Sequence, residues 1–337
     1  MLHRHLSVLL HRSAHSHGTV LVLGPRGAGK TTLLRRDFPG HTYASMDDAA
    51  DRVRARQNPG GFLAKFRGPS IVDDLHRAPE LVSLLAEHPV PHPVVFASSR
   101  RLRLQIATLE LHPPTAAERQ RRPALSLEML GRFVPAKPMA TPAYPQWNPP
   151  RGFLAHDVRD LVSVHDMDRF ERFLEVARAQ SGGVMDQQAM ADECNISHRT
   201  VARWIEVLDD CFQILRLAPA DFDAGRRLIR RPKIHFLDSN VFESRVITAI
   251  YRNAKHAGEE ADLRFWRDSN GFEIPLVIQQ AGMLPMPVSI AEAATPREVT
   301  RLRRWMELAG VAQGTMISDR EGPLRGGAIQ RYSIAQL

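Results

Sequence analysis

Long apolar runs, cysteine pairs and internal repeats are the features that this sequence lacks. No stretch approaches the roughly 20 apolar residues that a membrane-spanning helix needs, so we expect no membrane partner. The two cysteines, Cys194 and Cys211, are too few for a disulfide framework and fit a reducing compartment. The sequence therefore predicts a cytoplasmic protein whose parts each fold around an apolar core.

Charge is what the sequence has in excess. The chain of 337 residues carries 45 basic and 37 acidic residues, a formal net charge of +8 at pH 7. This balance favours an anionic partner such as a nucleotide or a nucleic acid, although many basic proteins merely carry a solvated charged face. The length suggests two or three domains. The His-rich first segment, Met1–Gly18, has some character of a transit peptide, but we interpret it as an amphipathic first helix with a solvated polar face rather than a metal site.

A phosphate-binding motif follows that segment. Residues 24–31 read GPRGAGKT, which satisfies the pattern G-x-x-x-x-G-K-[ST], and an apolar strand (TVLVL, residues 19–23) precedes them. Glycines allow the backbone N–H groups to point at phosphate oxygens, while Lys30 supplies a cation for the β- and γ-phosphates and Thr31 a hydroxyl for Mg²⁺. The predicted nucleotide-binding residues are Gly24, Pro25, Arg26, Gly27, Ala28, Gly29, Lys30, Thr31, Thr32 and, from a later strand, Ser99. The alternative, a chance Gly-rich turn, fits the flanking strand and helix poorly.

Acidic residues complete the predicted site. Asp73 ends a second apolar strand, SIVD, and would hold Mg²⁺, while Asp74 would polarise the attacking water. The plain alternative is a solvated turn after a strand. Strands are also expected at residues 94–97 and 106–111, with a helix at 79–86, as in a parallel sheet covered by helices on both faces. The Ser98-Ser99 pair could sense the γ-phosphate or merely cap a turn, and an arginine among Arg100, Arg101 and Arg103 could act as a finger across a subunit boundary or lie on a basic surface turn.

Several blocks of the chain together resemble a widespread prokaryotic family of AAA-type P-loop ATPases with a C-terminal winged-helix and degenerate PD-(D/E)xK nuclease-like domain of unknown function. The blocks include LGPRGAGKTTLL, SIVDDLHRAPEL, VVFASS, FERFLEVARAQSG, SHRTVARWIEVLDDCFQILRL and GRRLIRRPKIHFLDS. The resemblance implies an ATP-hydrolysing protein. The family has Glu where this chain has Asp74, and Thr-Gly-Ser where it reads ASS, so only Ser99 carries over. Of the carboxylates that a PD-(D/E)xK nuclease uses to hold its metal, this chain keeps only Glu273, in the sequence Glu-Ile-Pro. We therefore predict no nuclease activity.

A pattern typical of a helix-turn-helix motif lies near the middle of the chain. Residues 187–194 and 198–210 read as helices around a tight turn, after a helix that begins near Asp166. Ser197 can cap the second helix. Three side chains at its start, His198, Arg199 and Arg203, would face outward as possible DNA contacts. The later basic residues Arg226, Arg227, Arg230, Arg231 and Lys233 could reach phosphates. A packing module without DNA is equally compatible with this pattern.

These observations predict an α/β protein. We expect a parallel-sheet P-loop ATPase domain (1–122), a Pro-rich linker or reduced lid (123–165), a winged-helix module (166–222) and a small α/β nuclease-like domain (223–337). Strands are predicted at residues 233–237 and 273–278, and helices at 244–254 and 297–309. The predicted function is an ATPase, slow because of Asp74, in which Mg-ATP drives rearrangement of the C-terminal modules. The alternatives are a DNA-binding regulator switched by ATP and a protein-interaction scaffold with decayed hydrolysis; a homo-oligomer or a protein client fits any of them.

Overall fold

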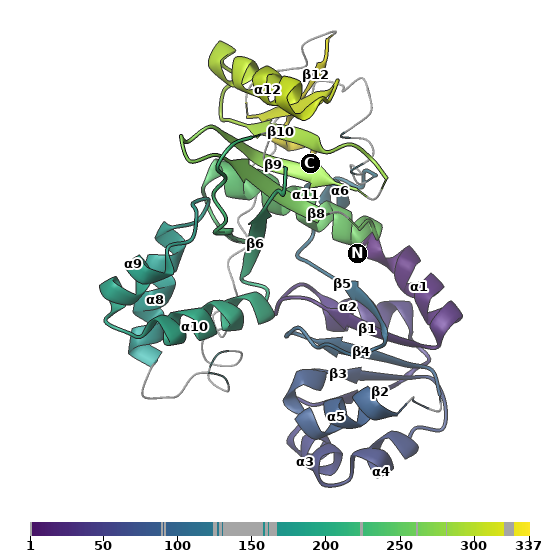
Figure 1. The fold of residues 1–337 in the computed structure, drawn as a ribbon. Helices are drawn as coiled ribbons and strands as arrows, with labels where there is room; N and C mark the ends of the chain where they lie inside the picture. The colour runs from purple at the N-terminus through teal and green to yellow at the C-terminus, as the bar shows by residue number, and fades with distance from the viewer. Residues whose placement is uncertain are drawn as a thin grey trace.

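Two β-sheets and a group of three helices make up the fold (Figure 1). The computed structural model describes residues 2–88, 90, 92–123, 127, 130, 158, 161, 167–222, 225–260, 262–280, 282–319 and 327–337. The predicted linker or lid, residues 123–165, lies outside the described residues apart from five single positions. Within the described residues, no helix has the length and apolar character to cross a bilayer.

The first sheet is fully parallel, as the sequence predicted, with the order β2-β3-β4-β1-β5. Its strands are β1 (Thr19–Leu23), β2 (Thr42–Ser45), β3 (Ser70–Asp73), β4 (Val94–Ser98) and β5 (Ala107–Glu110). Four of these strands were expected. Strand β2 was not predicted, because this short edge strand has only one buried residue and therefore no apolar run.

Helices cover both faces of this sheet. The helices α1 (Leu6–His17) and α2 (Lys30–Asp37) pack on one face against Val20 and Val22. The other face, which includes Leu21, is covered by α3 (Ala49–Gln57), α4 (Pro59–Ala64) and α5 (Pro79–Glu87). Successive side chains of a strand point to opposite faces, so β1 contributes to both apolar cores. A short 3₁₀ turn, Leu75–Arg77, follows β3, and α6 (Ala116–Arg119) follows β5.

Three helices form a separate core. They are α8 (Met167–Ala179), α9 (Gln187–Cys194) and α10 (His198–Asp210), and the last two have the predicted bounds. Asn195 ends α9 in the left-handed conformation, which Asn tolerates better than most residues. The Ser197 hydroxyl then accepts a hydrogen bond from the Thr200 N–H at 3.1 Å and begins α10. Phe170 and Phe173 of α8 pack against Trp204 of α10, so aromatic rings fix the helices relative to one another.

The second sheet is mixed and has seven strands in the order β12-β11-β10-β9-β8-β6-β7. Its strands are β6 (Ile214–Pro219), β7 (Lys233–Phe236), β8 (Asp262–Arg267), β9 (Glu273–Gln279), β10 (Met286–Ile290), β11 (Gly314–Ser318) and β12 (Ile329–Ser333). Strand β6 pairs with both β7 and β8, so the sheet crosses the boundary expected between residues 222 and 223. A final 3₁₀ turn, Ile334–Gln336, follows β12.

Two helices cover the second sheet. Leu276 and Ile278 pack with α11 (Phe242–Ala257), while Ile274 and Val277 pack with α12 (Pro296–Ala309). The helix α11 also lies beside α1, so the second sheet is joined to the N-terminal part (Figure 1).

Candidate nucleotide site

The loop from Gly24 to Gly29, called the glycine loop below, connects β1 to α2 in a conformation that needs glycine. Gly24, Gly27 and Gly29 all have positive φ values, of 153°, 80° and 92°. A Cβ atom on Gly24 would lie 1.9 Å from the Leu111 carbonyl oxygen, so no other residue fits there without moving the backbone. The loop is therefore folded tightly against the end of β5.

Lys30 directs its side chain back into this loop. The Lys30 Nζ donates hydrogen bonds to the carbonyl oxygens of Gly24 (2.7 Å) and Pro25 (3.0 Å), and to Ser99 Oγ (3.1 Å). Its side chain is buried. Because Lys30 is also the first residue of α2, its ammonium group and the positive end of that helix lie at the same point. This arrangement attracts anions.

Thr31 and Asp73 meet although 42 residues separate them in the sequence. The Thr31 hydroxyl donates to Asp73 Oδ2 at 2.6 Å, and the Tyr43 hydroxyl donates to the same oxygen at 3.0 Å. Burial, together with the Asp73 carboxylate, raises the pKa of Tyr43 to about 12, so its phenol stays protonated. A hydroxyl and a carboxylate side by side are hard oxygen ligands of the kind that Mg²⁺ prefers.

Asp74 follows Asp73 in a left-handed backbone conformation (φ 55°). Its backbone N–H donates to Asp73 Oδ1 at 2.9 Å, which fixes the turn. Burial and the adjacent Asp73 charge raise the pKa of Asp74 to about 6, against the opposing influence of Lys30 and Arg26. A carboxyl group with a pKa near neutrality can accept a proton from water.

Ser99 and His76 complete the site on the side of β4. The Ser99 hydroxyl contacts Lys30 as described, and the Ser99 N–H points at His76 Nδ1 across 3.4 Å. Burial and the nearby Arg100 lower the pKa of His76 to about 3, so the ring is neutral at pH 7 and can accept this hydrogen bond. His76 was not predicted as a site residue, because a lone histidine after a strand forms no recognisable motif. Ser98 instead donates to the Arg100 carbonyl and so caps the turn.

The remaining predicted loop residues take simpler positions. Ala28 is buried, Arg26 is partly exposed, and Thr32 is exposed in the first turn of α2. The Ala28 N–H donates to the Pro25 carbonyl, which closes the loop on itself. All the residues predicted to hold phosphate and metal thus lie within or beside one loop.

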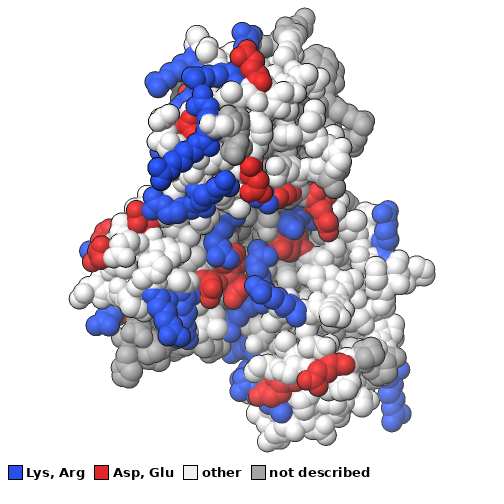
Figure 2. Space-filling model, viewed as in Figure 1, with Lys and Arg blue, Asp and Glu red and all other residues white. Residues whose placement is uncertain are grey.

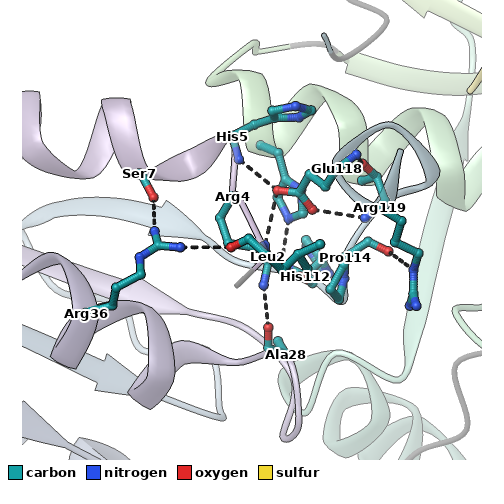
Figure 3. A network of polar contacts seen from close by, with 12 residues as sticks. Leu2, Arg4, His5, Ser7, Ala28, Arg36, His112, Pro114, Glu118 and Arg119 are labelled. Atoms are coloured by element: carbon teal, nitrogen blue, oxygen red, sulfur yellow. Dashed lines mark hydrogen bonds and ion pairs between the residues drawn. The ribbon is translucent and has the colours of Figure 1, made fainter. Parts of the chain in front are cut away.

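A buried arginine, which the sequence analysis missed, supports the glycine loop from behind (Figure 3). Arg4 donates to the Ala28 carbonyl at 2.8 Å and to Glu118 Oε1 at 3.1 Å. Glu118 also accepts from the His5 N–H and lies 3.4 Å from His256 Nδ1 of α11. Burial opposes ionisation of Glu118, but His256 and Arg4 more than offset it and lower its pKa to about 2. The loop is therefore connected to α11 through two buried side chains.

Comparison with known proteins finds similarity to one family model and to two uncharacterized proteins. Residues 151–244 match the family model described as a domain of unknown function, DUF8612. This stretch includes the three-helix group, β6 and β7. An uncharacterized protein of Mycobacterium tuberculosis and one of Mycobacterium bovis are each 23% identical to the chain over 332 residues. The similarity covers 87% of this chain and 74% of each relative, so it takes in parts of both sheets.

A second connection runs from the end of β4 to the C-terminal part. Arg101 donates to Glu110 Oε1 at 2.8 Å, and its guanidinium lies over the Phe212 ring at 4.3 Å. The Arg101 N–H donates to the Asp210 carbonyl at the end of α10, and the Tyr251 hydroxyl of α11 donates to Glu110 at 2.7 Å. Among the three arginines considered as fingers, Arg101 is thus engaged within its own chain.

The predicted DNA contacts lie on the surface of α10. His198, Arg199 and Arg203 are exposed, and Val201, Ile205 and Leu208 are buried as the periodicity predicted. Asp209, which would repel DNA, pairs with Arg216 at 2.7 Å. These positions are compatible with a surface for phosphates and equally with a plain solvated face.

Lys233 is not available to phosphates, contrary to the expectation from the basic run. Its side chain is 2% exposed and donates to Glu243 Oε1 at 2.7 Å and to Glu273. The motif suggested that Glu273 has no second carboxylate nearby. In the structure, Glu243 of α11 accepts a hydrogen bond from the same Lys233 ammonium group. The Lys233 ammonium nevertheless occupies the position between the two carboxylates, and Arg267 also pairs with Glu273 at 3.1 Å. The described residues hold no group of three or more His, Cys, Asp or Glu arranged for a metal ion. The loss of nuclease activity stays a prediction.

Proposed function

We propose that this protein binds Mg-ATP in the glycine loop and hydrolyses it slowly. The observation that carries the proposal is the contact of Thr31 with Asp73 beside the buried Lys30 ammonium. P-loop NTPases use the same parts: a glycine loop, a lysine at a helix N-terminus, and a hydroxyl paired with a strand-end carboxylate. On this reading the N-terminal part is a P-loop domain of AAA type.

The roles of the residues follow from their positions. Lys30 would exchange the Gly24 and Pro25 carbonyls for phosphate oxygens, and the loop N–H groups would hold the remaining phosphate charge. Thr31 and Asp73 would hold Mg²⁺, which would neutralise charge on the phosphates. Asp74 would orient the attacking water and accept its proton, while Ser99 would contact the γ-phosphate. Aspartate is one methylene shorter than glutamate, which argues for slow turnover.

Hydrolysis would be coupled to the rest of the chain through the two connections described above. Arg4 links the glycine loop to Glu118 and α11, and Arg101 links the end of β4 to α10 and α11. A change in the loop or at Ser99 would therefore reach the three-helix group, interpreted as a winged-helix module, and the nuclease-like second sheet. We propose that these modules rearrange with the nucleotide state.

Calorimetric titration with Mg-ATP tests the binding step. Lys30→Ala removes the ammonium group and is expected to weaken binding at least 100-fold, an effect of about 3 kcal/mol. Lys65→Ala is the matched control, because Lys65 pairs with Asp51 on the surface, away from the loop. The proposal fails if the unaltered protein does not bind Mg-ATP or if both variants bind it equally well.

Turnover tests the catalytic step separately. Asp74→Glu extends the carboxylate towards the position that most ATPases use, and we expect the hydrolysis rate to rise several-fold while the affinity for ATP changes little. Release of inorganic phosphate at saturating ATP measures this rate. An unchanged or lower rate would remove Asp74 as the water-positioning residue and would favour a scaffold in which ATP is only bound.

A second candidate function is DNA binding through α10, with ATP as a switch. The exposed start of this helix, with His198, Arg199 and Arg203, favours it. It predicts that Arg199→Ala weakens salt-dependent DNA binding.

A further inference from the structure

A basic hollow lies on the C-terminal part, away from the glycine loop and from α10. Its volume is about 480 Å³, and one wall is the exposed face of α12 with Arg297, Thr300, Arg301 and Arg304. The other wall is the tip between β8 and β9, Asn270–Phe272. The three arginines follow the helical spacing i, i+4 and i+7, so their guanidinium groups line up along about 10 Å of the helix.

The tip of the hairpin is held in a fixed shape. The buried Asp268 carboxylate accepts hydrogen bonds from the N–H groups of Asn270 and Phe272, both at 2.9 Å, and pairs with Arg226. These bonds and that pairing lower the pKa of Asp268 despite its burial, so the carboxylate remains charged. Trp266 packs on the Phe272 ring from below, at 5.2 Å between centroids. Hydrogen bonds and ring packing thus define the backbone shape of one wall of the hollow.

Arginines surround the aromatic ring in the hollow. The guanidinium carbons of Arg226 and Arg304 lie 5.6 and 5.4 Å from the Phe272 centroid. Of the described arginines on α12, only Arg301 has an acidic partner, Glu298 at 3.6 Å. The positive charge of Arg297 and Arg304 is therefore not neutralised by any described carboxylate.

The basic surface continues beyond the hollow. The Ser269 N–H donates to the Arg227 carbonyl at 2.8 Å, which places the exposed Arg227 next to the hairpin tip. Figure 2 shows Lys and Arg side chains gathered along the upper left of the molecule, where Figure 1 has α12, and continuing below that helix. A strip of cations of this length matches a chain of regularly spaced phosphates better than a single small anion.

We propose that this strip, from Arg227 across the hollow to α12, binds the phosphate backbone of a nucleic acid strand. The arginines contact phosphates, and the guanidinium groups held over Phe272 offer flat surfaces on which a base can stack. The proposal requires neither nucleotide binding in the glycine loop nor DNA binding by α10.

Fluorescence anisotropy with a labelled 20-nucleotide single strand, at 50 and 200 mM KCl, tests this surface. The double variant Arg297→Gln/Arg304→Gln is expected to bind at least tenfold more weakly. Its log Kd should also depend less steeply on log salt, with a slope lower by about 1.4, as for two lost phosphate contacts. The charge-matched control Arg12→Gln/Arg67→Gln changes exposed arginines of the N-terminal part and should bind as the unaltered protein does.

A second variant keeps every arginine in place. Thr300→Glu puts a negative charge inside the hollow, and it should also lose affinity while its Tm stays near that of the unaltered protein. Lys30→Ala should bind the strand normally. The proposal is overturned if the unaltered protein does not bind the oligonucleotide or if the α12 variants bind it as tightly as the unaltered protein. It is also overturned if only Arg199→Ala weakens binding, or if anionic lipid vesicles displace the labelled strand better than the unlabelled oligonucleotide does.

Discussion

Two adjacent aspartates at the end of β3 have very different surroundings. Asp73 accepts hydrogen bonds from Thr31 and Tyr43, so its negative charge is well satisfied. Within the described part of the chain, Asp74 has no comparable set of donors. Burial and the adjacent Asp73 charge raise its pKa to about 6. An ionised Asp74 therefore costs stability in the folded protein, as is common for groups poised for catalysis.

A pH-dependent stability change follows for Asp74→Asn. A carboxyl group whose pKa rises from 3.8 to about 6 on folding favours the folded state below pH 3.8, and this contribution disappears as the pH rises through 6. We expect Asp74→Asn to raise the free energy of unfolding at pH 8, by about 1 kcal/mol after solvent screening. The gain should largely vanish at pH 4.

Thermal melts of both proteins at pH 4 and pH 8 measure this effect. Asp262→Asn is a suitable control, since Asp262 is an exposed partner of Arg264 in the second sheet. An equal shift in Tm at both pH values would mean that the ionised Asp74 is not destabilising.

At the scale of elements, the start of α10 depends on one side chain. Its hydrophobic face is strong, with Val201, Trp204, Ile205 and Leu208 all buried. The first turn has exposed N–H groups, however, and Ser197 satisfies one of them.

Removal of this cap should destabilise the three-helix group. We expect Ser197→Ala to lower the free energy of unfolding by about 1 kcal/mol, because the Thr200 N–H then lacks its partner. Chemical denaturation measures the change. Ser16→Ala, inside α1 and exposed, should be neutral or slightly stabilising, because alanine favours helices. Loss of equal size in both variants would refute the capping role.

At the scale of the whole molecule, α11 is the element on which both connections converge. It provides His256 beside Glu118 and Tyr251 beside Glu110. Both acidic residues belong to the N-terminal part, and burial alone would raise their pKa values. Their basic neighbours instead hold both pKa values well below the usual range, so both carboxylates stay charged at pH 7. Burial lowers the pKa of His256 and raises the pKa of Tyr251, which favours the neutral forms of these two partners.

This convergence predicts how α11 responds to nucleotide. Mg-ATP should change hydrogen-exchange protection in residues 242–257, and Tyr251→Phe should reduce this change, because it removes the hydrogen bond to Glu110. Tyr332→Phe is the control, since it removes a tyrosine hydroxyl that donates to Gln330 Oε1 within the second sheet, away from Glu110. An α11 response that Tyr251→Phe leaves intact would exclude this route, provided that calorimetry shows unchanged ATP binding.

Local patterns in the sequence determined a large part of this protein. The glycine spacing, the apolar runs of four strands and the 3.6-residue periodicity of α8, α9 and α10 are short-range signals, and each element formed where its signal lay. Ser197 was likewise identifiable as a cap, because capping involves only the next three residues. Edge strands such as β2 were not, since pairing rather than composition makes them strands.

Only the tertiary structure decided which distant groups meet. Arg4 and Glu118 lie 114 residues apart, and nothing in either neighbourhood indicates that they pair behind the glycine loop. The same holds for Arg101 with Tyr251, and for Lys233, which a basic run placed on the surface and the fold placed between two carboxylates. The physical reason is that burial and ion pairing depend on how the elements pack together, whereas caps, turns and periodicity depend on residues that are already neighbours in the chain.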